Sequence, residues 1–203
     1  MRILALSDKI VDVLYGPSLR SSVGEVDVIV GCGDLPSPYL EYIVTSLNAP
    51  LVYVPGNHDA DDFRVQGGES IDGRVVQIRG VRFAGLGGSQ RYKLQGDHQY
   101  TESQMLGRIT LLAPRLALAR LSRGRGVDVF VTHAPPQSIH DGQDLAHWGF
   151  SAFRSFLSAF RPRLMLHGHV HAIRNLDPTE TQVLDTRVIN VYPYRLIELG
   201  VER

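Results

Sequence analysis

The chain has 203 residues, of which 43% are hydrophobic and 21% are charged, an ordinary composition for a globular domain. Lys and Arg number 21 and so do Asp and Glu, so no basic excess points to general nucleic-acid or membrane-surface binding. The length predicts a single domain, 1–203, with a sizeable core. The one cysteine, Cys32, excludes an intrachain disulfide, and its place in an apolar run favours a buried core position.

The first residues, 1–7, are apolar but reach Asp8 before they could form the core of a signal peptide. No apolar run approaches the length of a membrane span. We therefore expect a cytoplasmic protein.

Short, nearly continuous apolar runs rich in β-branched residues recur along the chain, as is typical of strands buried on both faces. These runs are 3–6, 26–30, 51–54, 127–131 and 164–166. Between them, apolar residues at helical spacing predict helices over 37–47, 101–121 and 150–160. Pro114 should kink or break the second helix, and the aromatic stripe of the third should pack into the core.

Two regions predict antiparallel pairing. Segments 75–78 and 81–84 flank Arg79-Gly80 as a hairpin, and 183–184, 188–191 and 196–199 should pair locally near the end of the chain. Strands that alternate with helices, followed by locally paired strands, indicate an α/β fold: a mixed sandwich with helices on the outside.

Asp, Asn and His residues gather directly after the apolar runs. The five clusters are Ser7-Asp8, Gly33-Asp34, Gly56-Asn57-His58-Asp59, Thr132-His133 and Gly168-His169-Val170-His171. Any one cluster is also a normal turn sequence. Five in succession favour one metal site at the carboxyl ends of the strands, since carboxylate, amide oxygen and imidazole without thiolate suit divalent ions.

This pattern resembles that of the calcineurin-like metallophosphoesterases. The family blocks D-x-H, G-D, G-N-H-D, a lone His and G-H-x-H all occur in order between residues 8 and 171, apart from the His of the first block. Segment 134–150 is similar to small bacterial, phosphodiesterase-type members. The resemblance implies an αββα sandwich of two mixed sheets flanked by helices, a dinuclear metal centre and hydrolysis of phosphoesters.

The resemblance also implies roles for the ligands. Asp34 would bridge two ions, one held by Asp34, Asn57, His133 and His169, and the other by Asp8, Asp34 and His171. Metal-activated hydroxide would attack phosphorus in line with the leaving group. Manganese, iron, zinc and nickel all fit these ligands, with one or two ions per chain.

Other residues are candidates for substrate contact. The resemblance gives His58 a contact with the phosphoryl oxygen or proton donation to the leaving group, with Asp59 orienting its imidazole, so His58 and Asp59 are the expected catalytic pair. The expected substrate-binding residues are Asn57, His58 and Arg91; Tyr92 could also reach a phosphate or a base. For His140 and His147, in the loop after His133, a structural role is favoured because no metal spacing singles them out.

Ile10 departs from the family pattern, because it stands where the first block has its His. An isoleucine cannot bind a metal, so we expect one tight ion at the complete site and a weak or absent ion at the other.

The leading hypothesis is a metal-dependent phosphodiesterase or small-nucleotide phosphohydrolase with a small phosphoester substrate. The alternative is a catalytically weakened or inactive scaffold, which Ile10 supports and retention of His58 opposes. The balanced charge gives a nuclease little support. The resemblance leaves a homodimer open.

Overall fold

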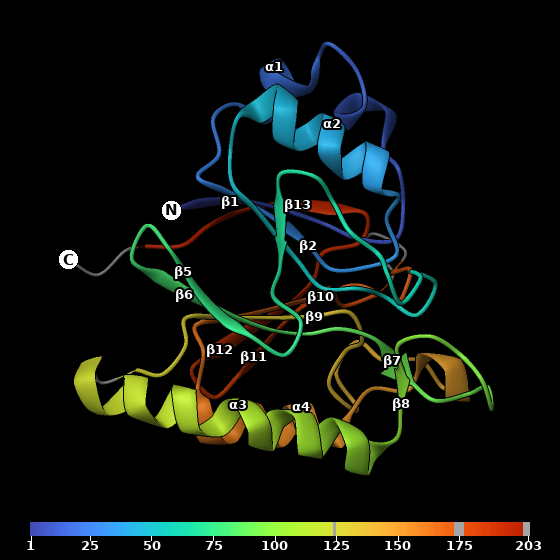
Figure 1. Ribbon diagram of the computed structural model, residues 1–203, viewed down its shortest axis with the longest axis vertical. Coiled ribbons are helices and arrows are strands. Elements are labelled where there is room, and N and C mark those ends of the chain that lie inside the picture. The colour runs from blue at the N-terminus through green and yellow to red at the C-terminus, as the bar shows by residue number, and fades with distance from the viewer. Residues whose placement is uncertain (124, 173–176, 201–203) are drawn as a thin grey trace.

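Two β-sheets pack face to face, and helices cover the outer face of each (Figure 1). This arrangement is seen in a computed structural model that describes residues 1–123, 125–172 and 177–200. The αββα sandwich implied by the sequence is thereby confirmed.

The first sheet has five strands in the order β13-β1-β2-β3-β4. Strands β1 to β4 are parallel to their neighbours, while β13 runs antiparallel along the edge of β1. The strands are β1 (Arg2–Leu6), β2 (Val28–Gly31), β3 (Leu51–Tyr53), β4 (Gly68–Ser70) and β13 (Tyr194–Glu198). On this side lie the 3-10 helix η1 (Asp12–Leu14) and the helices α1 (Leu19–Val23) and α2 (Ser37–Leu47).

The second sheet has six strands in the order β11-β12-β10-β9-β6-β5. Its four central strands are parallel, and both edge strands are antiparallel. The strands are β5 (Val75–Ile78), β6 (Val81–Leu86), β9 (Val129–Thr132), β10 (Leu164–His167), β11 (Glu180–Val183) and β12 (Thr186–Asn190). Helices α3 (Glu102–Arg123) and α4 (Ser151–Phe160) cover it, and the sheet is joined to a short ribbon of β7 (Ser89–Gln90) and β8 (Gln99–Tyr100) and to the 3-10 helix η2 (Leu145–His147).

Apolar side chains fill three layers. One layer lies between the two sheets and includes Ile3, Val30 and Val131; Cys32 is buried there, as predicted. The second lies between the first sheet and α1 and α2. The third lies between the second sheet and α3 and α4, where the predicted aromatic stripe packs, with Phe156 stacked on Phe130 at 3.9 Å between ring centroids. Burial of both sheet faces explains why the strand sequences are continuously apolar.

The parallel central strands place their carboxyl ends, and hence the loops that follow them, along one edge of each sheet. The polar clusters of the sequence all follow strands β1, β2, β3, β9 and β10. The fold therefore brings distant segments together at one end of the sandwich.

The structure corrects two predictions about elements. Helix α3 continues through Pro114, so the break that was one of the two expected effects does not occur. Pro114 lies on the exposed side, where water can satisfy the carbonyl that loses its partner, while Leu112 and Leu116 are buried on either side and anchor both halves. Strand β13 does not pair with its sequence neighbours but crosses to β1 in the other sheet.

The predicted hairpin at Arg79-Gly80 is confirmed. Strands β5 and β6 are antiparallel, and the turn residues Arg79 and Gly80 have φ of 48° and 85°. None of the described helices combines the length and apolar character that crossing a membrane requires.

Candidate metal centre

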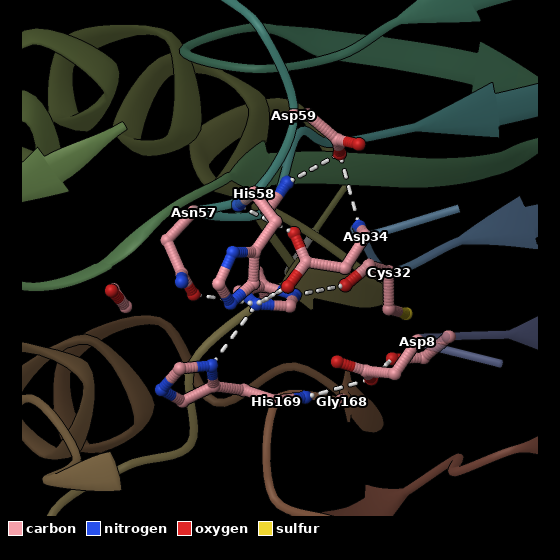
Figure 2. Close-up of polar contacts among 12 residues, drawn as sticks. Asp8, Cys32, Asp34, Asn57, His58, Asp59, Gly168 and His169 are labelled. Carbon is pink, nitrogen blue, oxygen red and sulfur yellow. Dashed lines mark hydrogen bonds and ion pairs between the residues drawn. The ribbon is translucent and has the colours of Figure 1, made fainter. Parts of the chain in front are cut away.

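Four side chains from four strand ends converge on one point. The Nε2 atom of His133 lies 3.3 Å from Asp34 Oδ2, 3.1 Å from Asn57 Oδ1 and 3.1 Å from His169 Nδ1. Asp34 follows β2, Asn57 follows β3, His133 follows β9 and His169 follows β10 (Figure 2). In the described part of the chain, Asp34, His133 and His169 also form a group whose ligand atoms lie within 4.8 Å of one another.

The hydrogen bonds around this point fix which atoms face it with lone pairs. His133 Nδ1 lies 2.7 Å from the carbonyl oxygen of Cys32, and His169 Nε2 lies 2.6 Å from that of Ala146. A carbonyl oxygen only accepts, so both of these nitrogens carry the proton. The neutral rings therefore turn the lone pairs of His133 Nε2 and His169 Nδ1 toward each other and toward Asp34.

The amide of Asn57 also turns its oxygen toward this point. Its Nδ2 donates to the hydroxyl of Tyr92 at 3.1 Å, which leaves Oδ1 facing His133. Two imidazole nitrogens, one amide oxygen and one carboxylate thus point at a common centre without a proton between them. Such a set repels itself unless a cation lies among its members, and its mixture of N and O donors suits a divalent metal.

The ionisation of the site follows from the same geometry. Burial lowers the pKa of His133, but the adjacent carboxylate of Asp34 outweighs it and raises that pKa to about 9. Burial raises the pKa of Asp34, but the charge and hydrogen bond of His133 outweigh burial and lower the pKa to about 2. Burial, with the charge of His133 beside it, lowers the pKa of His169 to about 3. Without metal, one proton therefore takes the place of the cation.

The turn after β3 is held by Asp59. Its buried carboxylate accepts the backbone N–H of Gly56 at 2.8 Å and that of Asp34 at 3.0 Å, and burial raises its pKa. The backbone N–H of His58 donates to Asp34 Oδ1 at 2.9 Å. Gly56 is required here because a side chain would collide with the Asp34 carboxylate. Asp59 thus joins the β2 and β3 loops, and its described hydrogen bonds go to the backbone rather than to the His58 imidazole.

The second expected ion site is poorer. Asp8 Oδ2 accepts from the Ser7 hydroxyl and from the backbone N–H of His169 at 3.0 Å, while Asp8 Oδ1 lies 3.7 Å from His171 Nε2. The His171 side chain is 61% exposed and stacks on Tyr192. The adjacent carboxylate of Asp8 raises the pKa of His171.

Ile10 is 40% exposed and offers this second site no ligand atom. The structure therefore brings Asp8 and His171 together as predicted, but with one imidazole fewer than the family pattern. Unequal binding of two ions stays a prediction.

The expected substrate-binding residues divide in two. The exposed side chain of His58 borders a hollow of about 390 Å³, also lined by Asp34, Asp59 and Phe63. Arg91 instead points its guanidinium at Gln104 Oε1 and the carbonyl of Gln99, at 3.1 and 3.3 Å. The structure thus places the Arg91 side chain against β8 and α3 and does not bring it into the cluster.

The two loop histidines have different surroundings. His140 Nδ1 lies 3.1 Å from Nε2 of the buried His167, and its Nε2 lies 2.9 Å from Thr181 Oγ1, so His140 fixes the loop to β10 and β11. His147 lies beside the centre, with its ring centroid 5.2 Å from that of His169. Sequence spacing could not reveal the contact between His147 and His169, because this contact depends on how the loop folds back.

Comparison with known proteins gives the family. The model for calcineurin-like phosphoesterase matches residues 3–172. An uncharacterized protein of Methanocaldococcus jannaschii, MJ1162, is 27% identical over 215 residues, which cover 95% of this chain and 88% of that protein.

Solved structures were also matched to this chain. TT1561 of Thermus thermophilus has a TM-score of 0.63 at 16% identity, over 94% of this chain and 88% of that one. Wild-type Vps29 of Entamoeba histolytica, complexed with zinc, has a TM-score of 0.44 at 13% identity, over 94% of this chain and 73% of that one. The family model spans most of the sequence and all five polar clusters, and the chain therefore belongs to the calcineurin-like phosphoesterase family.

Proposed function

We propose that the protein is a metal-dependent phosphodiesterase or small-nucleotide phosphohydrolase. The observation that carries this proposal is the convergence of lone pairs from Asp34, Asn57, His133 and His169 on one point. The family supports hydrolysis of a phosphoester. A small ester as substrate, manganese as a working metal, a cytoplasmic location and a homodimer are further parts of the proposal.

The residues at the centre would divide the work. Bound divalent ions polarise phosphoryl oxygens and make water more acidic. Asp34 supplies negative charge at all pH values above about 2. Asn57 adds a ligand without charge, which leaves the site less repulsive to a phosphate, and Tyr92 holds its amide in place.

His58 is the residue best placed to act on the leaving group. Its backbone is tied to Asp34, whereas its side chain is exposed and borders the hollow of about 390 Å³. A volume of this order lies at the small end of those of small-molecule sites. The hollow has room for a small ester.

Ile10 favours one alternative, a catalytically weakened or inactive binding protein. If two ions are needed for turnover, an incomplete second site lowers or abolishes it. The exposed His58 side chain opposes this alternative, since a scaffold has no need of an imidazole beside the metal.

The experiment is hydrolysis of an aryl phosphodiester and an aryl phosphomonoester with added manganese, using wild type, His58→Ala and Asp62→Ala. Asp62 is exposed on the same loop and serves as the control. We expect turnover of the diester, a loss of about 100-fold or more in His58→Ala, and no change in Asp62→Ala. No turnover of either ester by metal-loaded wild type would count against the proposal and for the scaffold.

A further inference from the structure

Helix α3 is apolar on two opposite faces. One face packs against the second sheet and carries the buried residues Met105, Ile109, Leu112 and Leu116. The other face points away from the molecule (Figure 1), and its leucines Leu111, Leu118 and Leu121 are 81%, 71% and 86% exposed. A helix that is apolar all round is normally buried. We propose that this outer face binds a second copy of the chain, as an antiparallel pair of α3 helices.

The outer face has the spacing of a seam between two helices. Its stripe consists of Gly107, Leu111, Pro114, Leu118 and Leu121, and all five residues are exposed. Successive members are alternately four and three residues apart. This spacing keeps side chains on one side of a helix and lets them interlock with those of a facing helix. The stripe is therefore a patterned surface, unlike single exposed leucines, which need no partner.

The stripe is complementary to itself when two copies run antiparallel. With Pro114 at the two-fold axis, Leu111 meets Leu118 of the second copy, and Leu121 meets Gly107 of the second copy. A side chain at Gly107 would meet no atom within 4 Å, so this position leaves room for the opposing leucine. This match of large against small side chains favours a second copy as the occupant over a membrane surface or an unrelated chain.

The surface is large enough for a dimer of moderate affinity. The 22 residues of α3 make a helix about 33 Å long. Helix α4 lies beside it, where Arg120 donates to the carbonyl of Ala159 at 3.2 Å. Two adjacent helices, each about 10 Å wide, offer about 650 Å². A specific interface needs at least about 600 Å² from each partner. The inference rests on the homodimer of the proposed function but not on its chemistry.

Charge gives the pair a characteristic salt dependence. The exposed Arg115 flanks the stripe, and residues 103–121 include no Asp or Glu. Arg115 and its copy would lie on the same side of the two-fold axis, so their like charges oppose pairing. Salt screens this repulsion, and self-association should therefore tighten as salt is added. An anionic membrane or a polyanionic partner would instead be attracted by these arginines and released by salt.

The test is sedimentation equilibrium of wild type, Leu118→Glu, Gly107→Leu and Leu94→Glu at low and high salt. We expect wild type to dimerise with a dissociation constant of about 1–10 μM and Leu118→Glu to be monomeric. Leu94 is the control, since it is 100% exposed on another loop, and Leu94→Glu should match wild type. Gly107→Leu adds apolar surface and helix propensity. It would strengthen non-specific association, but it should weaken the pairing proposed here by about tenfold or more.

A disulfide cross-link gives the direction of the pair. The native cysteine, Cys32, is buried, so a cysteine introduced on α3 is the accessible thiol. Under mild oxidation, Pro114→Cys should form a linked dimer, because its two copies meet at the axis. Leu121→Cys should not, because its copies would lie about 20 Å apart along the helices.

Three results would overturn the inference: monomeric wild type at about 100 μM, undiminished association of Gly107→Leu, and cross-linking of Leu121→Cys but not of Pro114→Cys. Monomeric wild type that binds anionic vesicles would assign the face to a membrane and overturn it too. Ester hydrolysis by monomeric wild type would uphold the proposed chemistry without the inference. A dimer that meets these tests but hydrolyses neither ester would do the reverse.

Discussion

His133 Nε2 and His169 Nδ1 face each other at 3.1 Å, and the other nitrogen of each ring is bound to a backbone carbonyl. Those carbonyls, of Cys32 and Ala146, fix the tautomers and leave two lone pairs opposed. A cation must therefore occupy the space between the rings: a proton in metal-free protein, and a divalent ion when metal is supplied.

The metal-free protein should lose stability as pH rises from about 6.5 to 9. The folded pKa of His133 is about 9, above its ordinary 6.5, so its contribution is complete below pH 6.5 and is lost as pH rises through 9. It amounts to about 3 kcal/mol at most. The folded pKa of His169 is about 3, so stability also falls as pH drops from 6.5 toward 3. Melting temperatures of chelator-stripped protein should therefore peak near pH 6 to 7.

Metal-saturated protein is the control, because its ligands are already deprotonated and should show no such loss between pH 6.5 and 9. Metal-free and metal-loaded proteins with parallel melting curves across that range would contradict the assignment of His133.

Tyr92→Phe should weaken metal binding about tenfold by removing the hydroxyl that orients the Asn57 amide. Tyr100→Phe, in the neighbouring β8, removes a hydroxyl that is not part of the centre and should bind metal as wild type does. Competition with a metal-sensitive dye measures both. Equal metal affinities of the two variants would show that the Asn57 amide does not need the hydrogen bond to the Tyr92 hydroxyl.

Asp59→Ala should destabilise the fold by about 2–4 kcal/mol, because the N–H groups of Gly56 and Asp34 lose their acceptor. Asp59→Asn keeps an oxygen for both N–H groups and should be near wild type in denaturant unfolding and in turnover. If Asp59 instead acts through the His58 imidazole, Asp59→Asn would keep its stability but lose most of its turnover.

Ile10→His should strengthen the weaker ion site by about tenfold or more, since it returns an imidazole beside Asp8 and His171. The side chain is 40% exposed, so the change costs little packing, and Ile10→Leu controls for it. Elemental analysis should find more metal per chain in Ile10→His than in Ile10→Leu. No difference between the variants would mean that position 10 does not face the ion.

Most of the fold, and the convergence of the candidate metal ligands, could be predicted because both depend on local patterns. Buried parallel strands are continuous apolar runs, and the residues that follow them must meet at one sheet edge. The candidate ligands therefore follow their strands at the sheet edge, as predicted; they are Asp8, Asp34, Asn57, His133, His169 and His171.

The predictions that failed, and the features that were missed, depend on distant contacts. Pairing of β13 with β1 joins residues from opposite ends of the chain, and Pro114 is tolerated because its face of α3 meets water. The backbone carbonyls of Cys32 and Ala146 fix the histidine tautomers. Because every residue has such a carbonyl, the sequence does not indicate which ones accept these hydrogen bonds. The contact of His147 with His169 likewise depends on the path of a long loop.

One tight metal site should form from four side chains, those of Asp34, Asn57, His133 and His169. Calorimetric titration with manganese tests it most directly, on wild type, His169→Ala and His171→Ala. We expect one tight ion in wild type that is lost in His169→Ala and kept in His171→Ala. Two equally tight ions in wild type, or a tight ion that survives His169→Ala, would contradict it.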